Sequence, residues 1–148
     1  MTRLTTLLAL FLVTLNPPSA VQAAGPVSAN CNVVVEYVYG GALVEEYIKD
    51  FVVQQGVAYE DDFSTTTRTK VFSAILTKEA GKAVVNIDYF NDVGVFVAIG
   101  FNTRLTLRGT GNPESTSGSH TTYISSGVTP TSVGGNHETH YTLVCTRG

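Results

Sequence analysis

The chain has 148 residues, 43% of them hydrophobic, and its 12 acidic and 9 basic side chains give a formal charge of −3. This length and hydrophobic content are sufficient for a single domain with one core. The acidic balance argues against a nucleic acid partner, because each phosphate contact needs a Lys or Arg.

The N-terminus has the composition of a secretory leader. Arg3 supplies a positive charge, and the apolar run from Leu4 to Leu15 is shorter than the roughly 20 residues that a membrane-spanning helix needs. Small residues follow, with Ala23 before the expected cleavage site. We predict a signal peptide over residues 1–23 and a single secreted domain over residues 24–148. The alternative, a core helix at the N-terminus, is disfavoured because that helix would have no polar face.

The predicted mature chain keeps 8 basic side chains against 12 acidic ones, so its formal charge is −4. Seven acids lie between Glu36 and Asp62, where the only basic residue is Lys49. The run from Val93 to Phe101 is broken by two glycines and is too short for a membrane span. We therefore expect no membrane span after leader cleavage and a location outside the cytoplasm, either extracellular or, in a Gram-negative bacterium, periplasmic.

The chain contains two cysteines, Cys31 and Cys145, one near each end of the predicted mature domain. In an oxidising compartment the simplest interpretation is an intramolecular disulfide. Closing so long a loop stabilises a fold by about 4 to 5 kcal/mol in the chain-entropy model. Two reactive thiols or an intermolecular bridge are the alternatives, and two cysteines alone cannot make a structural zinc site.

Two elements are predicted at the start of the mature chain. Alternating apolar residues over Cys31 to Tyr39 indicate a strand, which Gly40-Gly41 ends. From Ala42 to Gln55 the apolar spacing is helical, and Glu45 and Lys49 lie on the polar face in the favourable i, i+4 order. The segment is therefore predicted to be an amphipathic helix, with its apolar face formed by Leu43, Val44, Tyr47, Ile48, Phe51 and Val52.

The rest of the chain predicts consecutive strands, because β-branched and aromatic residues alternate with polar ones between turn residues. Lys78-Glu79-Ala80-Gly81 is a compact turn within the clearest hairpin, and Asn102 separates a second pair. Gly109 to Ser119 is predicted to be a mobile polar loop, and Gly127 to Glu138 a polar connection. The expected strands are Thr65 to Thr77, Lys82 to Phe90, Val93 to Phe101, Thr103 to Arg108, Thr121 to Ser126 and Thr139 to Thr146.

This order of elements predicts an α+β fold, in which one amphipathic helix packs on a curved antiparallel sheet of about six or seven strands. The disulfide joins the termini and places the first and last strands close together. In element order the layout resembles cystatin-like and NTF2-like folds, as well as some small secreted ribonucleases and inhibitors.

Three histidines are the first candidates for a functional site. His137 and His140 lie three positions apart, and in a strand such residues point to opposite faces. The histidine pair of a zinc protease instead lies four positions apart on a helix. His120 would join His140 only if the last hairpin paired the two. We therefore expect no metal site and no cofactor.

A small secreted hydrolase, such as a ribonuclease, is the alternative function. Histidine titrates near neutral pH, Glu138 can take a proton, and Arg104 or Arg108 can hold a phosphate. The sequence does not contain the nucleophile elbow of an α/β-hydrolase at Ser117-Gly118-Ser119-His120. A phosphate-binding loop is also not expected at Gly109-Thr110-Gly111, because no strand-to-helix context surrounds it. No catalytic residue is therefore assigned.

Acidic residues offer a further candidate for cation binding, at Asp88, Asp92 and Glu60-Asp61-Asp62. The spacing of an EF-hand loop is absent from the sequence. These acids are expected to solvate strand ends and a turn.

The chain has seven tyrosines, more than a minimal core uses. Tyrosine is favoured at interfaces, and several on one sheet face or loop would suit binding; alternatively, they cap the core edges with hydroxyls in water. We predict a secreted, non-enzymatic binding protein of the inhibitor, effector or virulence-factor type, acting on a protein or glycan through residues that the sequence does not identify. The tyrosines are Tyr37, Tyr39, Tyr47, Tyr59, Tyr89, Tyr123 and Tyr141.

Overall fold

The computed structural model describes residues 27–94, 97–124 and 134–148, and within these ranges the chain forms eight strands. The predicted signal peptide, residues 1–23, lies outside the described residues. In the described ranges, no helix is long and apolar enough to cross a membrane. The strands are β1 (Ser28–Tyr39), β2 (Ala42–Gln54), β3 (Ala58–Asp62), β4 (Lys70–Glu79), β5 (Lys82–Gly94), β6 (Val97–Leu107), β7 (Pro113–Ile124) and β8 (Gly135–Arg147).

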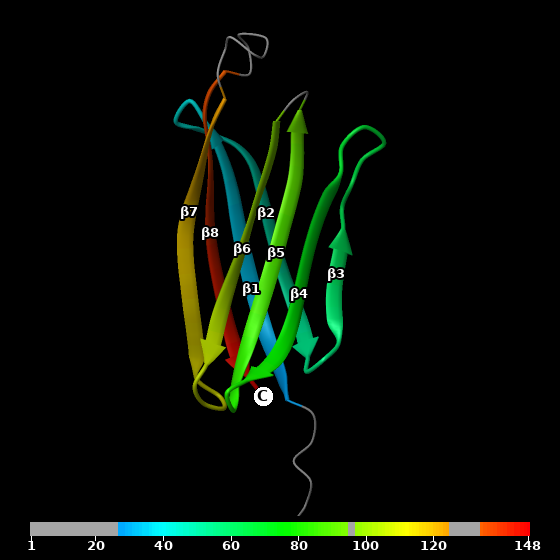
Figure 1. Ribbon diagram of the computed structural model, residues 1–148, viewed down its shortest axis with the longest axis vertical. Coiled ribbons are helices and arrows are strands. Elements are labelled where there is room, and N and C mark those ends of the chain that lie inside the picture. Colours follow the sequence, from blue (N-terminus) through cyan, green and yellow to red (C-terminus); the bar gives the residue numbers. More distant parts are fainter. Residues whose placement is uncertain (1–26, 95–96, 125–133) are drawn as a thin grey trace, which may run out of the picture.

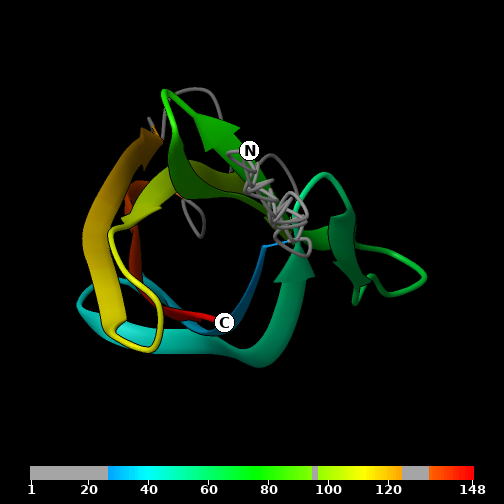
Figure 2. The same cartoon turned by 90° about the horizontal axis from the view of Figure 1, so that it is seen from below.

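The strands form two four-stranded antiparallel sheets (Figure 1). Sheet A has the order β2-β1-β8-β7, and sheet B has the order β3-β4-β5-β6. The chain passes from sheet A to sheet B between β2 and β3, and it returns between β6 and β7. Seen from one end, the two sheets curve around a common interior (Figure 2). This two-layer arrangement gives every strand one face toward the core and one toward solvent.

The predicted disulfide is confirmed. Cys31 of β1 lies directly opposite Cys145 of β8 in the ladder, with a Cα–Cα distance of 4.1 Å, and both side chains face the interior. The bond therefore links the first strand to the last at the centre of sheet A. It closes a chain segment whose ends differ by 114 positions.

Aromatic rings from both sheets fill the interior. Tyr47 of sheet A packs on Phe72 and Tyr89 of sheet B, with ring-centroid distances of 5.6 Å and 5.8 Å. Farther across, Tyr141 of sheet A stacks on Phe101 of sheet B at 4.4 Å. Such pairs add to the free energy of burial and fix how the sheets face each other.

The predicted helix over Ala42 to Gln55 is wrong, because β2 occupies this segment. Gly40 and Gly41, with φ values of 59° and 80°, form the two-residue turn that folds β2 back onto β1. Apolar residues spaced one, three or four positions apart lie on one side of a helix. In a strand, neighbouring residues point to opposite faces, so the same residues of β2 are divided between the interior and the outer face. Tyr47, Phe51 and Val53 point inward and are buried, whereas Ile48 and Val52 point outward and are exposed.

The α+β prediction is therefore wrong, since the described chain is all-β with two sheets rather than one. The resemblance to cystatin-like and NTF2-like folds does not hold, because it depended on a helix packed on a single sheet. The hairpin around Lys78 to Gly81 is confirmed, with Ala80 and Gly81 at positive φ between β4 and β5.

Two further boundaries differ from the prediction. Asn102 does not separate two strands but lies in the middle of β6. Most of the predicted loop from Gly109 to Ser119 belongs to β7, an edge strand that pairs with β8 along its whole length. Its Ser and Thr side chains suit a strand with a solvent-facing side, and pairing with β8 satisfies the backbone groups on that side of the strand. Of the predicted connection from Gly127 to Glu138, residues 127–133 lie outside the described residues, and β8 begins within the remainder.

Candidate binding surfaces

An exposed stripe runs along β2 on the outer face of sheet A, and in it apolar residues alternate with Glu46 and Asp50. Leu43, Val44, Ile48 and Val52 have 57%, 58%, 56% and 56% of their surface exposed. Ile48 lies directly opposite the outward Val34 of β1, which extends the stripe toward the sheet centre. Exposed apolar residues gathered on one face of a folded protein mark a contact surface more often than scattered ones do.

The carboxylates in and beside this stripe have no Lys or Arg neighbour on the described outer face of sheet A. Glu36 of β1 lies directly opposite Glu46 of β2, and both are on the outer face. Along the described strands of sheet A, no outward position is occupied by Lys or Arg. Like charges directly opposite each other destabilise a sheet, so this pair lowers the stability of the fold.

A hollow of about 390 Å³ adjoins this acidic pair on sheet A. Glu36 and His140 line it, as does the Ser117-Gly118-Ser119 segment of β7. The small residues of β7 leave the space open beside the carboxylate. His140 lies next to Glu36 in the ladder, and its Nε2 is 3.2 Å from Oε2 of Glu138. A cationic group inserted into the hollow would therefore meet the Glu36 carboxylate.

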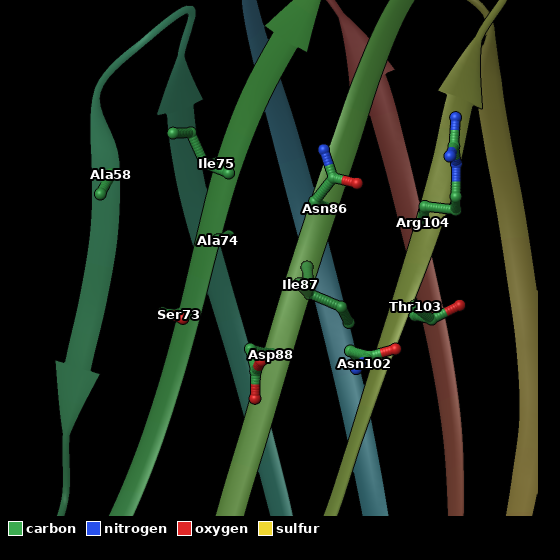
Figure 3. A pocket seen from close by; sticks show the side chains of 10 residues that line it. All are labelled: Ala58, Ser73, Ala74, Ile75, Asn86, Ile87, Asp88, Asn102, Thr103 and Arg104. Carbon is green, nitrogen blue, oxygen red and sulfur yellow. The ribbon is translucent and has the colours of Figure 1, made fainter.

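A larger hollow, of about 580 Å³, lies on the outer face of sheet B (Figure 3). Two cross-strand rows form its floor. One row is Ser73, Asp88 and Asn102, and the next is Ile75, Asn86 and Arg104, contributed in each case by β4, β5 and β6. Asn86 donates to Oγ1 of Thr77 at 3.1 Å, and Arg104 pairs with Glu79 at 2.6 Å.

The interior contains a polar layer near one end of the sheets. Glu45 of sheet A forms an ion pair with Lys70 of sheet B, and both are largely buried. The Tyr37 hydroxyl hydrogen-bonds to Nδ1 of His137 at 2.7 Å, and Tyr39 stacks on the same imidazole. These contacts connect strands far apart in sequence, so they specify how the strands are placed.

Burial changes the acidity of several tyrosines in the interior. Burial raises the pKa of Tyr89 to about 12, although a hydrogen bond from Asn91 opposes the shift. Burial likewise raises the pKa of Tyr37. The pKa of Tyr47 is raised by burial and by its 2.8 Å hydrogen bond to Asp61.

Asp61 has the opposite shift. Burial alone would raise its pKa, but hydrogen bonds from Tyr47 and Lys49 outweigh burial and hold it below its ordinary value. The Lys49 ammonium lies 3.0 Å from the same carboxylate oxygen that accepts from Tyr47. The predicted helical pair of Glu45 with Lys49 is therefore replaced by two ion pairs to sheet B.

The three histidines do not converge. His137 is buried and faces inward, whereas His140 lies on the outer face of sheet A. His120 pairs with Thr139 rather than with His140. Across the described ranges, no group of three or more His, Cys, Asp or Glu side chains is arranged to hold a metal ion.

The residues of the hydrolase alternative lie on opposite sides of the molecule. Arg104 belongs to the outward series of sheet B and Arg108 directly follows β6, whereas Glu138 and His140 belong to the outward series of sheet A. Ser117-Gly118-Ser119-His120 lies within β7, not at a strand-to-helix turn. Gly109-Thr110-Gly111 lies in the link between β6 and β7.

The acidic candidates for cation binding are separated as well. Asp88 lies in the sheet B hollow, and Asp92 lies at the far end of β5. Glu60 and Asp62 point outward from β3, while Asp61 points inward to Tyr47 and Lys49. The tyrosines also differ from an interface cluster, since six of them are buried or half-buried and only Tyr123, at 71%, is largely exposed.

Sequence reasoning missed the apolar stripe of sheet A, although the signal was present. Ile48 and Val52 were assigned to the buried face of a helix, so their exposure could not be recognised. The structure is that of a disulfide-linked, two-sheet antiparallel β-protein with a candidate binding surface on each outer face. The chain matches no protein-family model and no curated protein.

Proposed function

We propose that this protein is exported and acts as a non-enzymatic binding protein, through the outer face of sheet A. Its partner is a protein surface that presents apolar side chains together with Lys or Arg. The observation that carries the proposal is the exposed stripe of Leu43, Val44, Ile48 and Val52 beside the unneutralised pair Glu36 and Glu46.

The stripe supplies affinity. Complete burial of an aliphatic side chain is worth about 1.5 to 3 kcal/mol, and these residues are already partly covered, so each would contribute roughly 1 kcal/mol. β2 is also an edge strand of sheet A, and its position allows a partner to reach the stripe from the side. An interface of this kind needs apolar side chains on both surfaces.

The carboxylates supply specificity. A cation placed between Glu36 and Glu46 would relieve their repulsion, whereas an acidic partner would add to it. The hollow beside Glu36 and His140 provides room for the end of a Lys or Arg side chain. This charge pattern therefore favours a basic partner and disfavours an acidic one.

Export is part of the proposal, on the basis of the leader-like N-terminus and the disulfide. Disulfides persist in oxidising compartments, which agrees with a function outside the cytoplasm. A binding protein in that location is of the inhibitor, effector or virulence-factor type.

Titration with defined peptides tests the binding surface. The probe is a short peptide of alternating Val and Arg, and its control is a peptide of alternating Val and Glu. We expect saturable binding of the Val-Arg peptide alone, with backbone amide shifts in NMR spectra concentrated on β1, β2 and β8. Ile48→Ser and the double variant Glu36→Gln/Glu46→Gln should each weaken binding about tenfold.

A matched double variant, Glu60→Gln/Asp88→Asn, changes the net charge equally but on sheet B, and it should bind the Val-Arg peptide like the unaltered protein. Equal binding of both peptides, or equal loss in both double variants, would contradict the proposal. Shifts located on sheet B would also contradict it.

A further inference from the structure

The hollow on the outer face of sheet B contains three polar side chains that make no side-chain hydrogen bond among the described residues. Among the described residues, Ser73, Asp88 and Asn102 make no side-chain hydrogen bond, although they form one continuous row across β4, β5 and β6. A hydroxyl, a carboxylate and an amide therefore present donors and acceptors to the same open space (Figure 3).

The adjacent row is held in place by other residues. Asn86 is fixed by its hydrogen bond to Thr77, and Arg104 is fixed by its ion pair with Glu79. Fixed polar groups lose little conformational freedom when a ligand binds, which favours affinity. The hollow thus combines a preorganised row with a row that is free to bind.

An aromatic ring continues the same face of β5. Phe90 is two positions beyond Asp88, points outward and is 42% exposed. Gly100 lies directly opposite Phe90, and a Cβ atom there would come 3.0 Å from the Tyr89 carbonyl oxygen and 3.8 Å from Cδ2 of Phe90. The absence of a side chain at Gly100 leaves the Phe90 ring open on that side.

The charges of this surface disfavour an anion. Asp88 lies within the hollow and Glu60 lies beside Ser73, while the guanidinium of Arg104 is already paired with Glu79. An anionic ligand would meet carboxylates before any free cation. The hollow combines apolar side chains, Ala58 and Ile75 among them, with amide, hydroxyl and carboxylate groups, and a ligand that has both apolar C–H groups and hydroxyls matches such a lining.

We propose that this hollow binds a neutral oligosaccharide. A sugar ring has an apolar face of C–H groups, which matches the Phe90 ring, and a rim of hydroxyls, which matches Asp88 and Asn102. The site is on the opposite sheet from the proposed protein-binding face. It therefore stands whether or not that first proposal holds.

Titration with neutral tetrasaccharides tests the site. The probes are chitotetraose, cellotetraose, maltotetraose, mannotetraose and xylotetraose, each added to the disulfide-bonded protein and followed by NMR. We expect at least one to bind saturably and to shift the side-chain amide signals of Asn86 and Asn102. Asp88→Ala and Phe90→Ala should each weaken that binding about tenfold, since one loses charged hydrogen bonds and the other the stacking surface.

Matched changes elsewhere separate the site from a general effect on the fold. Asp50→Ala removes an outward carboxylate of sheet A, and Tyr123→Ala removes an exposed aromatic ring; both should leave sugar binding unchanged. The variant Glu36→Gln/Glu46→Gln should also bind sugar normally, which distinguishes this site from the peptide-binding face. The inference is overturned if none of the five sugars binds, or if binding survives both Asp88→Ala and Phe90→Ala.

Discussion

Glu36 of β1 lies directly across the antiparallel ladder from Glu46 of β2, and both carboxylates are on the outer face of sheet A. On the other side of Glu36 the neighbour in the ladder is His140, and the outward positions of the described sheet A strands hold no Lys or Arg. Proteins commonly keep locally unfavourable residues where a binding surface requires them. The stability lost to this repulsion should therefore be recoverable.

Glu46→Lys should raise the free energy of unfolding by about 0.5 kcal/mol, because it replaces a repulsive cross-strand pair by an attractive one. The same variant should lose binding of the Val-Arg peptide. Urea unfolding and peptide titration measure the two effects. Glu60→Lys, whose cross-strand neighbour is the uncharged Ser73, should change neither quantity appreciably. A fall in stability for Glu46→Lys would show that the pair is not repulsive.

Replacing both cysteines, as Cys31→Ala/Cys145→Ala, should lower the free energy of unfolding by about 4 kcal/mol, because the unfolded chain regains the freedom that the long closed loop removes. Chemical denaturation under oxidising conditions measures the loss. Added reductant should destabilise the unaltered protein and leave the double variant unaffected. If the double variant matched the unaltered protein in stability, the bond would have no role in maintaining the fold.

Glu45→Gln should lower the free energy of unfolding by about 2 kcal/mol, because it leaves the Lys70 ammonium without its anionic partner in a largely buried position. The matched variant is Glu79→Gln, which breaks the more exposed ion pair with Arg104. That change should cost less than about 1 kcal/mol. Urea unfolding at neutral pH compares the two, and equal losses would mean that burial does not strengthen the Lys70 pair.

Tyr89 should make the protein sensitive to alkali. Its pKa is about 12 when folded and near 10 when unfolded, so above pH 10 the unfolded state releases its proton first. Stability from this group is therefore complete below pH 10 and is lost as the pH rises from 10 to 12, by about 3 kcal/mol in total.

Tyr89→Phe should flatten the fall in stability over that pH range, as measured by urea unfolding at a series of alkaline pH values. Tyr123→Phe is the matched control, since Tyr123 is 71% exposed in the folded protein and should not alter the profile. Identical slopes for Tyr89→Phe and the unaltered protein would contradict the assignment.

Gly118→Ala should lower the free energy of unfolding by about 1 to 3 kcal/mol. A Cβ at this position would lie 2.6 Å from the Tyr141 hydroxyl oxygen. That ring cannot move away freely, because it stacks on Phe101 and its hydroxyl donates to Thr103 at 3.1 Å. Ser117→Ala, at the neighbouring exposed position, is the control and should be nearly neutral. Thermal unfolding measures both, and an unchanged midpoint for Gly118→Ala would show that Tyr141 can rearrange.

Several features followed from the sequence because they depend on few residues. Two cysteines in a chain with a leader-like N-terminus allow one intramolecular pairing, and Cys31 does pair with Cys145. The hairpin turn between β4 and β5 falls within Lys78 to Gly81, because the positive φ angles of Ala80 and Gly81 reverse the direction of the chain. Alternation at Leu105 and Leu107 likewise marks the buried side of β6.

Only the tertiary structure decided the state of residues 42 to 54. Apolar residues at positions such as Tyr47, Ile48, Phe51 and Val52 fit one face of a helix and both faces of a strand equally well. Hydrogen bonding to β1 selects the strand, and pairing with β8 does the same for the Ser- and Thr-rich β7. Long-range backbone pairing outweighs local preference in both segments.

The candidate binding surfaces could not be derived from the sequence either, because each collects residues from several strands. Glu36 and Glu46 are ten positions apart, and Ser73 and Asn102 are separated by β5. Which side chains share a face depends on strand register, and a shift of one residue would send them to opposite sides of the sheet. The sequence by itself thus determined the disulfide and a turn, whereas the register of the two sheets determined which side chains share each candidate surface.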